Sequence, residues 1–411
     1  MSPTTNADAT YPGPEHVQCP YPFFDEARSS TPVWQHPGSG VYYVFEWDDV
    51  MTMMRDGDTF QGVNGSISYG GVPMISAAAG AEHQGMRSLA LLPFTKSRLR
   101  TYESMITAFA DQLIDGFIDT GEVELVNQFA IPLPALVICK LMGFDLEGPE
   151  FDFVVDRMSM KSADNAEMVQ SGNHELGVVR RTTTGGGYGG GGIEVVQEFM
   201  KDKLEQRLDH PGDDILTEIA RAQIERDGEV DMPYLVTIST ELLAGGVVTT
   251  AQMMANAMML ALHNPDQMEL VLRDRSYVVP MLDEALRVES PVQSQGRIAV
   301  RDCVLGGVEI PEGAHLAAVF GSANRDPKRF SDPERFDVTR PPVDLKGHFG
   351  FGFGMHFCLG APLALLEGRI GLGRLFDRIT NIRTATEYDV RYIDSTHFRA
   401  VREQRLRFDR R

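Results

Sequence analysis

A long uncharged stretch near the middle of the chain constrains the fold more than any other feature. The residues from Leu242 to Leu262 include no acidic or basic side chain, and the helical pattern around them extends over about residues 231–263. A membrane-spanning helix is one interpretation, but two glycines and several polar side chains interrupt the apolar character: Gly245, Gly246, Thr249, Thr250, Gln252 and Asn256. We therefore predict a helix that is buried inside a protein core.

Further helical patterns on both sides of this stretch predict a mainly α fold. They cover approximately residues 84–117, 122–143, 149–162, 193–208, 214–226 and 276–289, and most are bounded by Gly, Pro, Asp or Asn. Aromatic and β-branched residues predict a strand over Val41–Trp47, and short strands are expected near residues 297–320 and 383–408. The sequence thus predicts a helical fold with a minor β lobe.

The sequence contains no sign of a boundary between domains. The 411 residues contain no linker, internal repeat or sharp change in composition, so we expect a flexible tail over residues 1–15 and a single domain over 16–411. One glycine-rich run, Thr182–Gly192, has a composition that cannot hold a helix. It lacks the flanking pattern of a phosphate-binding loop, so we interpret it as a mobile connector, with the hinge of a substrate lid as the alternative.

The net charge and the cysteines indicate which binding partners and which cellular compartment the protein can have. The formal net charge is −20, so an anionic membrane surface or a nucleic acid would on average be repelled. The four cysteines lack CxxC spacing and the density of a disulfide-stapled domain, which is typical of a reducing cytoplasm. The N-terminal residues do not have the pattern of a signal peptide or membrane anchor. We therefore predict a cytoplasmic protein.

One cysteine lies in a sequence context that favours metal binding. Residues 348–366 form a glycine-rich loop that leads through Cys358 into an apolar, helix-forming run. A cysteine at a helix N-terminus is stabilised as the thiolate, which is the form that binds a metal ion. Gly354 and Gly360 allow the backbone to fold closely around the sulfur, and Phe351 supplies an apolar wall. For Cys19, Cys139 and Cys303 we expect an ordinary structural role.

The segment Phe351–Gly360, FGFGMHFCLG, fits the pattern FxxGx[HR]xCxG. In this respect the chain resembles the cytochrome P450 superfamily, and three further matches in the right order extend the resemblance from about residue 80 to about residue 365. The resemblance implies the cytochrome P450 fold, an α-helical bundle around haem with small antiparallel sheets. It also implies haem b with Cys358 as the axial iron ligand and Phe351, His356 and Gly360 around it.

The first further match concerns structure rather than chemistry. Glu284-Ala285-Leu286-Arg287 resembles the ExxR motif of the family, in which acid and base share one face of a helix. Pro333-Glu334-Arg335-Phe336 resembles the segment whose arginine completes an ion-pair triad. The resemblance implies that Glu284, Arg287 and Arg335 form this triad.

The second match concerns the two carboxylate groups of haem, its propionates. Glu82-His83-Gln84-Gly85-Met86-Arg87 resembles the start of a family helix, and His83 and Arg87 are spaced to reach one anion. By resemblance, Arg297 and His356 complete a set of four donors that holds the propionates.

The third match lies within the buried helix, where Leu242–Thr250 resembles the motif [AG]Gx[DE]T. Gly245 would open the helix beside dioxygen, and Thr249 would steady the oxygen intermediate and its water. Val248 stands where the family has an acid that delivers protons, and valine cannot do so. Three interpretations remain: another side chain or the substrate supplies the protons, the reaction does not end in oxygen rebound, or the enzyme accepts peroxide directly.

The implied activity is monooxygenation: one atom of O2 enters a small or medium lipophilic substrate such as a terpenoid, an aromatic, a steroid or another secondary metabolite. The alternative is a haem-thiolate enzyme with non-rebound chemistry, such as oxidative coupling, isomerisation or peroxide-driven oxidation. A haem-binding sensor would explain Cys358 but not Thr249. By resemblance, the substrate pocket includes Ile67, Tyr69, Met74, Ala244, Val248, Val292, Thr396 and His397.

Electrons must come from another protein, because no flavin or nicotinamide fingerprint accompanies the cysteine motif. The resemblance implies a ferredoxin or flavodoxin with its NAD(P)H-dependent reductase. A basic face would steer such an acidic partner, and the candidates are Lys96, Arg98, Arg100, Arg369 and Arg374.

Overall fold

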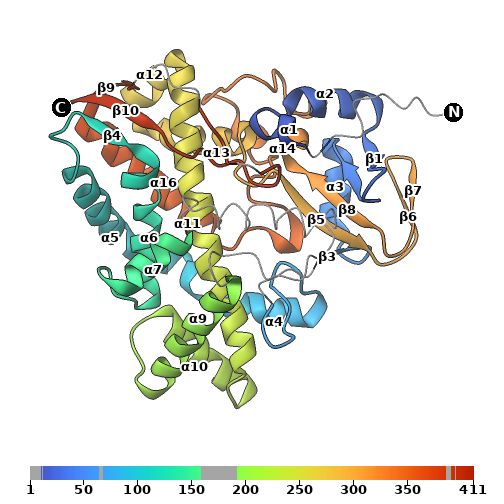
Figure 1. The fold of residues 1–411 in the computed structure, drawn as a ribbon, viewed down its shortest axis with the longest axis horizontal. Coiled ribbons are helices and arrows are strands. Elements are labelled where there is room, and N and C mark those ends of the chain that lie inside the picture. Colours follow the sequence, from blue (N-terminus) through green and yellow to red (C-terminus); the bar gives the residue numbers. More distant parts are fainter. Residues whose placement is uncertain (1–10, 12, 64–67, 159–191, 386–389, 394) are drawn as a thin grey trace.

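The computed structural model describes residues 11, 13–63, 68–158, 192–385, 390–393 and 395–411. Its helical part surrounds α11 (Met232–His263), which crosses the molecule in Figure 1. The other long helices are α4 (Gly80–Ala90), α5 (Lys96–Asp115), α6 (Pro132–Met142), α7 (Pro149–Met158), α9 (Gly192–Asp209), α10 (Ile215–Asp227), α12 (Pro265–Arg273), α13 (Val278–Val288) and α16 (Ala361–Arg378). The mainly α fold with a minor β part is confirmed.

The helix α11 has the start and the burial that its sequence predicts. The carboxylate of Asp231 accepts a hydrogen bond from the Tyr234 amide at 3.1 Å, and Pro233 occupies the first turn, where its missing N–H costs nothing. Within the described residues, α11 is the one helix long and apolar enough to cross a membrane, yet 67% of that apolar window is buried in the protein. The prediction of a buried core helix is confirmed.

Two of the predicted helical runs are interrupted. The run over 84–117 is divided between α4 and α5 by a single 3-10 turn, Leu92–Phe94, which contains Pro93. The run over 122–143 begins as a strand, β4 (Glu122–Glu124), and continues through a π-helical turn, Val126–Ala130, before α6 starts at Pro132. Proline lacks the amide that an uninterrupted helix needs, and both interruptions lie next to one.

The β part consists of three small sheets. The largest has the order β1 (Val33–Gln35), β2 (Tyr42–Val44), β8 (His315–Val319), β5 (Ser294–Ala299) and β3 (Phe60–Gly62). The expectation of antiparallel sheets needs one correction, since β2 and β8 run parallel. The other sheets join β4 with β10 (Arg405–Arg410) and β9 (Ile379–Thr384), and β6 (Cys303–Leu305) with β7 (Val308–Ile310).

The shorter helices support the sheet and the loops. They are α1 (Pro14–Gln18), α2 (Tyr21–Ser30), α3 (Trp47–Arg55), α14 (Phe320–Ala323), α15 (Pro342–Leu345) and the 3-10 turns Arg275–Tyr277 and Gly354–His356. The flexible tail expected over 1–15 is corrected at its end, because Tyr11 is buried against Phe23 and α1 begins at Pro14. Residues 1–10 and 12, and the expected glycine run up to residue 191, lie outside the described residues. The single domain remains a prediction.

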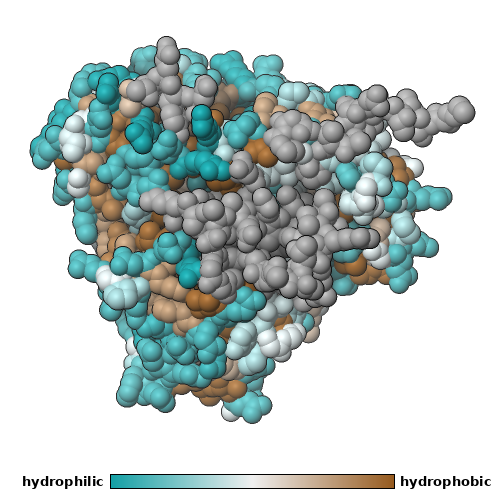
Figure 2. Space-filling view, in the orientation of Figure 1, coloured by the Kyte–Doolittle hydropathy of each residue, from teal (hydrophilic) through white to brown (hydrophobic). Residues whose placement is uncertain are grey.

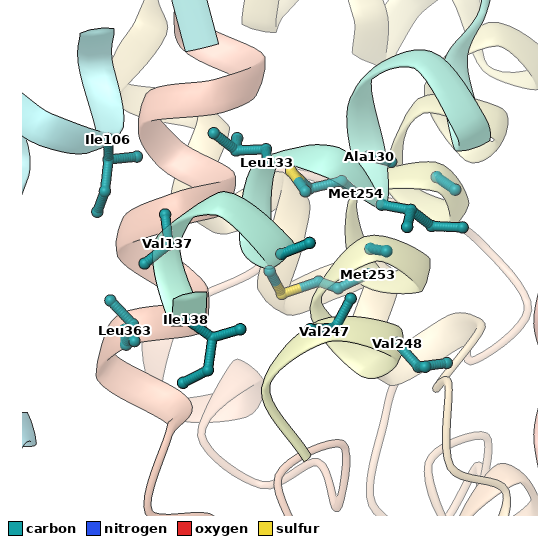
Figure 3. Packing of buried hydrophobic residues seen from close by; sticks show 14 of the residues in the cluster. Ile106, Ala130, Leu133, Val137, Ile138, Val247, Val248, Met253, Met254 and Leu363 are labelled. Atoms are coloured by element: carbon teal, nitrogen blue, oxygen red, sulfur yellow. The ribbon is translucent and has the colours of Figure 1, made fainter. Parts of the chain in front are cut away.

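The hydrophobic core follows this division into helices and sheet. The main cluster of buried apolar residues includes Ile106, Leu133, Ile138, Val247 and Met254, which meet between α5, α6 and α11 (Figure 3). A second cluster lies beneath the largest sheet. On the face shown in Figure 2, hydrophilic residues predominate among the coloured atoms, with hydrophobic residues in small groups. The helical core therefore holds α11 in place next to the loop that carries Cys358.

Candidate active site

The loop before α16 holds Cys358 in a tight backbone turn. Gly352 and Gly354 have φ angles of +69° and +71°, which side chains disfavour. A Cβ atom on Gly354 would lie 2.6 Å from the carbonyl oxygen of Met54, so a larger residue would displace the loop. The Cys358 amide donates to the Phe351 carbonyl at 2.9 Å, and α16 begins three residues later at Ala361. The loop thus presents one thiol at the start of a helix.

The environment of the Cys358 sulfur has opposing effects on its charge. Burial raises the pKa of the thiol, whereas hydrogen bonds from the Gly360 and Ala361 amides and the nearby Arg87 guanidinium act to lower it. The first effect is the largest in the protein alone, because the sulfur lies deep in the protein even though it is accessible from the cavity. A bound metal ion adds the positive charge that deprotonates a coordinating thiol. The site is therefore suited to a thiolate that forms on binding a metal centre.

A largely apolar cavity of about 350 Å³ separates Cys358 from α11. Its wall includes Gly245, Gly246, Thr249 and Thr250 from α11, and residues 349–352 and 356–360 of the cysteine loop. Apolar side chains from α11 and from other elements complete much of the lining: Ile75, Phe94, Ile138, Leu242, Met253, Leu286, Pro291, Val292, Phe320, Leu363 and Ala364.

Four basic side chains gather at one end of the cavity. His83 and Arg87 come from α4, Arg297 comes from β5, and His356 precedes the cysteine. The rings of His83 and His356 meet edge to face with centroids 4.7 Å apart, and Arg87 donates to the Phe357 carbonyl at 2.8 Å. In the described part of the chain, His83 Nε2, Arg297 Nη2 and His356 Nδ1 are buried without a hydrogen-bond partner. Such donors predict an anion at this position.

The pKa values of this cluster are lowered because it concentrates positive charge in a buried place. Burial, followed by the charges of Arg297, His83 and Arg87, lowers the pKa of His356 to about 3. Burial also lowers the pKa of Arg297 to about 10, and burial with the charge of Arg87 lowers that of His83. Bound carboxylates would satisfy the free donors and offset this repulsion.

The residues present fit haem. A thiol facing an apolar cavity can bind the iron, and a cluster of unsatisfied basic donors at the edge can bind two propionates. The fit rests on the orphaned nitrogens of His83, Arg297 and His356 and on the position of Cys358. Phe351 and Gly360, also predicted as haem contacts, line the same cavity.

The face of α11 toward the cavity carries the predicted glycine and threonine. A Cβ atom on Gly245 would meet no heavy atom within 4 Å, so this side of the helix is open. Thr249 lies one turn later, and its hydroxyl donates to the Gly245 carbonyl at 2.9 Å. In this orientation the Thr249 oxygen keeps its acceptor capacity for a proton donor in the cavity.

Val248 does not line the cavity, contrary to the expectation from the sequence. Its side chain is 7% exposed and belongs to the main hydrophobic core, together with its neighbour Val247 (Figure 3). Successive residues on a helix lie about 100° apart, so Val248 is rotated away from the face that carries Gly245 and Thr249. Position 248 therefore places no acidic side chain in the cavity wall.

The other predicted pocket residues divide into three groups. Val292 and His397 line the cavity. Tyr69, Met74, Ala244 and Thr396 are half-buried but lie off its wall, and this corrects the sequence expectation; Tyr69, Met74 and Ala244 pack against the main core instead. Ile67 lies outside the described residues.

Sequence analysis missed two acids in the cavity wall. Glu241 directly precedes the uncharged stretch on α11, and Glu367 follows the apolar run after Cys358 on α16. Burial raises the pKa of both carboxyls, that of Glu367 well above its ordinary value. A lone acid at the edge of an apolar helical run was the available signal, but periodicity alone does not reveal what lies opposite.

The ion-pair triad behind the cavity differs from the prediction in its third member. Arg287 and Glu284 form two hydrogen bonds, at 2.7 and 2.8 Å, and both are fully buried. The third member is Arg340, whose Nε donates to Glu284 Oε1 at 3.1 Å. Arg335 is exposed and contributes only its backbone carbonyl, which accepts from Arg287 at 3.0 Å. Any residue type could supply this backbone carbonyl, so the contact does not depend on the arginine side chain. The motif therefore pointed to the wrong arginine.

The predicted basic face is largely neutralised by nearby acids. Arg98 pairs with Glu218 at 2.8 Å, Arg369 with Glu103 at 3.2 Å and Arg374 with Asp111 at 2.9 Å. Lys96 and Arg100 are exposed, and no ion pair joins either of them to another described residue. These two therefore carry the unbalanced positive charge of the predicted set.

The comparisons with known proteins agree with this site. A family model described as Cytochrome P450 matches residues 62–382. The chain is 35% identical to 6-deoxyerythronolide B hydroxylase of Saccharopolyspora erythraea, over 75% of this chain and 70% of that protein. It is 32% identical to vitamin D(3) 25-hydroxylase of Pseudonocardia autotrophica, over 80% and 76% respectively.

A comparison with solved structures also supports this family. A crystal structure of P450BioI in complex with an acyl carrier protein ligated to hexadec-9Z-enoic acid has a TM-score of 0.81 and 26% identity, covering 96% of this chain and 99% of that one. Because the family model covers most of the chain and two hydroxylases exceed 30% identity, the chain belongs to the cytochrome P450 family of haem-thiolate monooxygenases.

Proposed function

We propose that this P450 hydroxylates a small or medium lipophilic molecule held in the cavity between α11 and the Cys358 loop. Membership of the family makes it an oxidoreductase that uses haem b and O2. The observation that carries the proposal is that the Thr249 hydroxyl and the Cys358 thiol face the same, mostly apolar cavity. Haem bound through a cysteine thiolate supplies the activation of dioxygen, and the protein supplies orientation, exclusion of water and proton positions.

We assign the four basic residues to haem binding. His83, Arg87, Arg297 and His356 would hold the propionates, because they cluster at one end of the cavity. Three of them, His83, Arg297 and His356, keep a buried nitrogen that has no hydrogen-bond partner among the described residues. Cys358 would bind the iron. The apolar lining would then exclude water from the reacting centre and bind the substrate by burial of apolar surface.

The substrate class is supported by the lining and by the relatives. Ile75, Phe94, Leu242 and Val292 present apolar surface to the cavity, while Ser294 and Gln295 add a few polar groups. Two related enzymes are named as hydroxylases of 6-deoxyerythronolide B and of vitamin D(3). A secondary metabolite or steroid-like molecule of comparable lipophilicity is therefore the substrate class that we propose.

Protons must reach the cavity by a route that does not use position 248. Thr249 Oγ1 can accept a hydrogen bond from a proton donor in the cavity. Glu367 Oε2 lies in the cavity wall, is buried, and has no hydrogen-bond partner among the described residues. Because burial raises the pKa of Glu367 well above its ordinary value, burial favours the protonated carboxyl, which is the form that can act as an acid. We propose Glu367 as the proton donor in place of an acid at position 248.

One observation favours a second candidate function. Val248 lies in an apolar core, so the acid that usually accompanies the threonine is missing. Oxidative coupling or isomerisation without oxygen rebound would dispense with that acid. Turnover under ¹⁸O2 separates the two functions: a hydroxylase product gains one labelled oxygen atom, whereas the product of a coupling or isomerising enzyme gains none. Unlabelled product from a complete electron-transfer system would reject our proposal.

We further propose a small acidic ferredoxin or flavodoxin as the electron donor. Lys96 and Arg100 would steer it, because the other basic residues of the set are paired with acids. Reversing both charges, Lys96→Glu with Arg100→Glu, is expected to slow the first reduction by about tenfold at low ionic strength and to reduce its salt dependence. Stopped-flow reduction of the haem by a ferredoxin at two salt concentrations measures this.

The control for this charge reversal is Arg374→Glu, a single reversal at a residue of the predicted set that is paired with Asp111. It should have a smaller effect than the double variant. If the double variant kept both the rate and its salt dependence, the electron donor would bind elsewhere.

A further inference from the structure

Glu241 places a carboxylate in the wall of the substrate cavity. It lies on α11 at the positions i−4 from Gly245 and i−8 from Thr249, so the three residues share the helix face that lines the cavity. Its carboxylate is held in a defined orientation by the segment before α4. Oε2 accepts from the Ile75 amide at 2.7 Å and Oε1 accepts from the Ser76 amide at 3.2 Å. The Ser76 hydroxyl also hydrogen-bonds to this carboxylate, and the remaining acceptor capacity is available to a ligand.

Among the described residues, this carboxylate has no charged counterpart. Within the described parts of the chain, no basic side chain forms an ion pair with Glu241. The other charged side chains of the wall have different surroundings: Arg87 and His356 belong to the basic cluster, and Glu367 lies on α16. His397 also lines the cavity, but burial lowers its pKa to about 4, so it is neutral at pH 7.

The two amide hydrogen bonds offset the cost of burying this acid only in part. Burial is the largest influence on Glu241 and raises its pKa, while the Ile75 and Ser76 hydrogen bonds lower it. A buried carboxylate is most stable beside a cation, and a cavity that otherwise excludes water strengthens that attraction. The missing partner can come from the ligand, because the carboxylate borders the space that the ligand fills.

We infer that Glu241 binds a cationic nitrogen of the substrate, so that the substrate is a lipophilic amine or quaternary ammonium compound. The inference rests on the proposed function and narrows its substrate class. Eight residues along α11 separate Glu241 from Thr249, about 12 Å of helix rise. The cationic end is therefore held away from Thr249, and the carbon that reacts lies several bonds from the nitrogen.

The test compares two ligands of the same shape that differ only in charge. Benzyltrimethylammonium and neopentylbenzene are isosteric, and the quaternary nitrogen has no lone pair with which to bind iron. Equilibrium dialysis with the haem-loaded protein should give at least about tenfold tighter binding of the cation. Glu241→Gln keeps the shape and one of the two acceptor oxygens that the Ile75 and Ser76 amides use, and it should abolish this preference while leaving the affinity for neopentylbenzene within about twofold.

The control is Glu269→Gln, which removes an acid that is 68% exposed on α12 and should keep the preference. Equal binding of both ligands by the unmodified protein would overturn the inference. So would a preference that survives in Glu241→Gln, or an equal loss of both ligands, which would reduce Glu241 to a support for residues 75–76. The ¹⁸O2 experiment tests the proposed function separately, because it depends on the origin of the product oxygen and not on ligand charge.

Discussion

Replacing Cys358 by alanine is expected to abolish the thiolate signature of the reduced carbon monoxide complex. Among the described residues, Cys358 is the one cysteine in the cavity wall, and the amides of Gly360 and Ala361 hydrogen-bond to its sulfur. Without the sulfur no group remains there to donate electron density to the iron, and product formation should fall by at least about a thousandfold, as when a reacting group is removed from an enzyme. Difference spectroscopy and product analysis measure the two effects.

Two further variants make this experiment decisive. Cys358→Ser preserves the size of the side chain and tests whether haem is still incorporated without a thiolate. Cys139→Ala removes a buried thiol of α6 that lies outside the cavity wall, and its spectrum should be unchanged. A thiolate signal that persisted in Cys358→Ala would identify another cysteine as the iron ligand.

Replacing Arg340 by alanine is expected to lower the free energy of unfolding by about 3 kcal/mol, because it breaks a buried ion pair and leaves acceptors unsatisfied. Arg340 is 7% exposed, donates to Glu284 at 3.1 Å and also donates to the Ser331 carbonyl at 2.8 Å. Denaturant unfolding of the haem-loaded protein, followed by circular dichroism, gives the change.

Arg335→Ala is the matched control for Arg340→Ala. It removes an exposed guanidinium and keeps the backbone carbonyl that Arg287 uses. The free energy of unfolding should therefore change by less than about 0.5 kcal/mol. If Arg335→Ala were the more damaging of the two variants, the triad expected from the sequence motif would be correct and the assignment of Arg340 would be wrong.

The sequence predicted the parts of the site that depend on local spacing. Cys358 lies at a helix start because the glycines before it and the apolar run after it specify a loop followed by a helix. Gly245 and Thr249 share a helix face because they are four residues apart. The cluster of His83, Arg87, Arg297 and His356 came from the family resemblance, since a helix, a strand and a loop cannot be joined by spacing alone.

The errors arose where tertiary packing decides between neighbouring residues. Arg335 and Arg340 are close to each other in the sequence, so the motif alone does not decide which of them reaches Glu284. The path of the chain after residue 335 buries only Arg340. Val248 and Thr249 are adjacent, but the rotation of α11 directs one into the core and the other into the cavity. Glu241 was overlooked because its importance depends on the cavity opposite, which no local pattern describes.

The strand order of the largest sheet has a consequence for the biosynthesis of the enzyme. The N-terminal strands β2 and β3 each need a partner from late in the chain. β2 pairs with β1 on one side and with β8 on the other, and β3 pairs with β5, so that Tyr42 pairs with Leu316 and Gly62 with Arg297. During translation these early strands must wait, with unpaired edges, until the chain has been made beyond residue 319. Arg297 and Cys358 are also made late. Stable capture of the cofactor is therefore one of the last events in the maturation of the nascent chain.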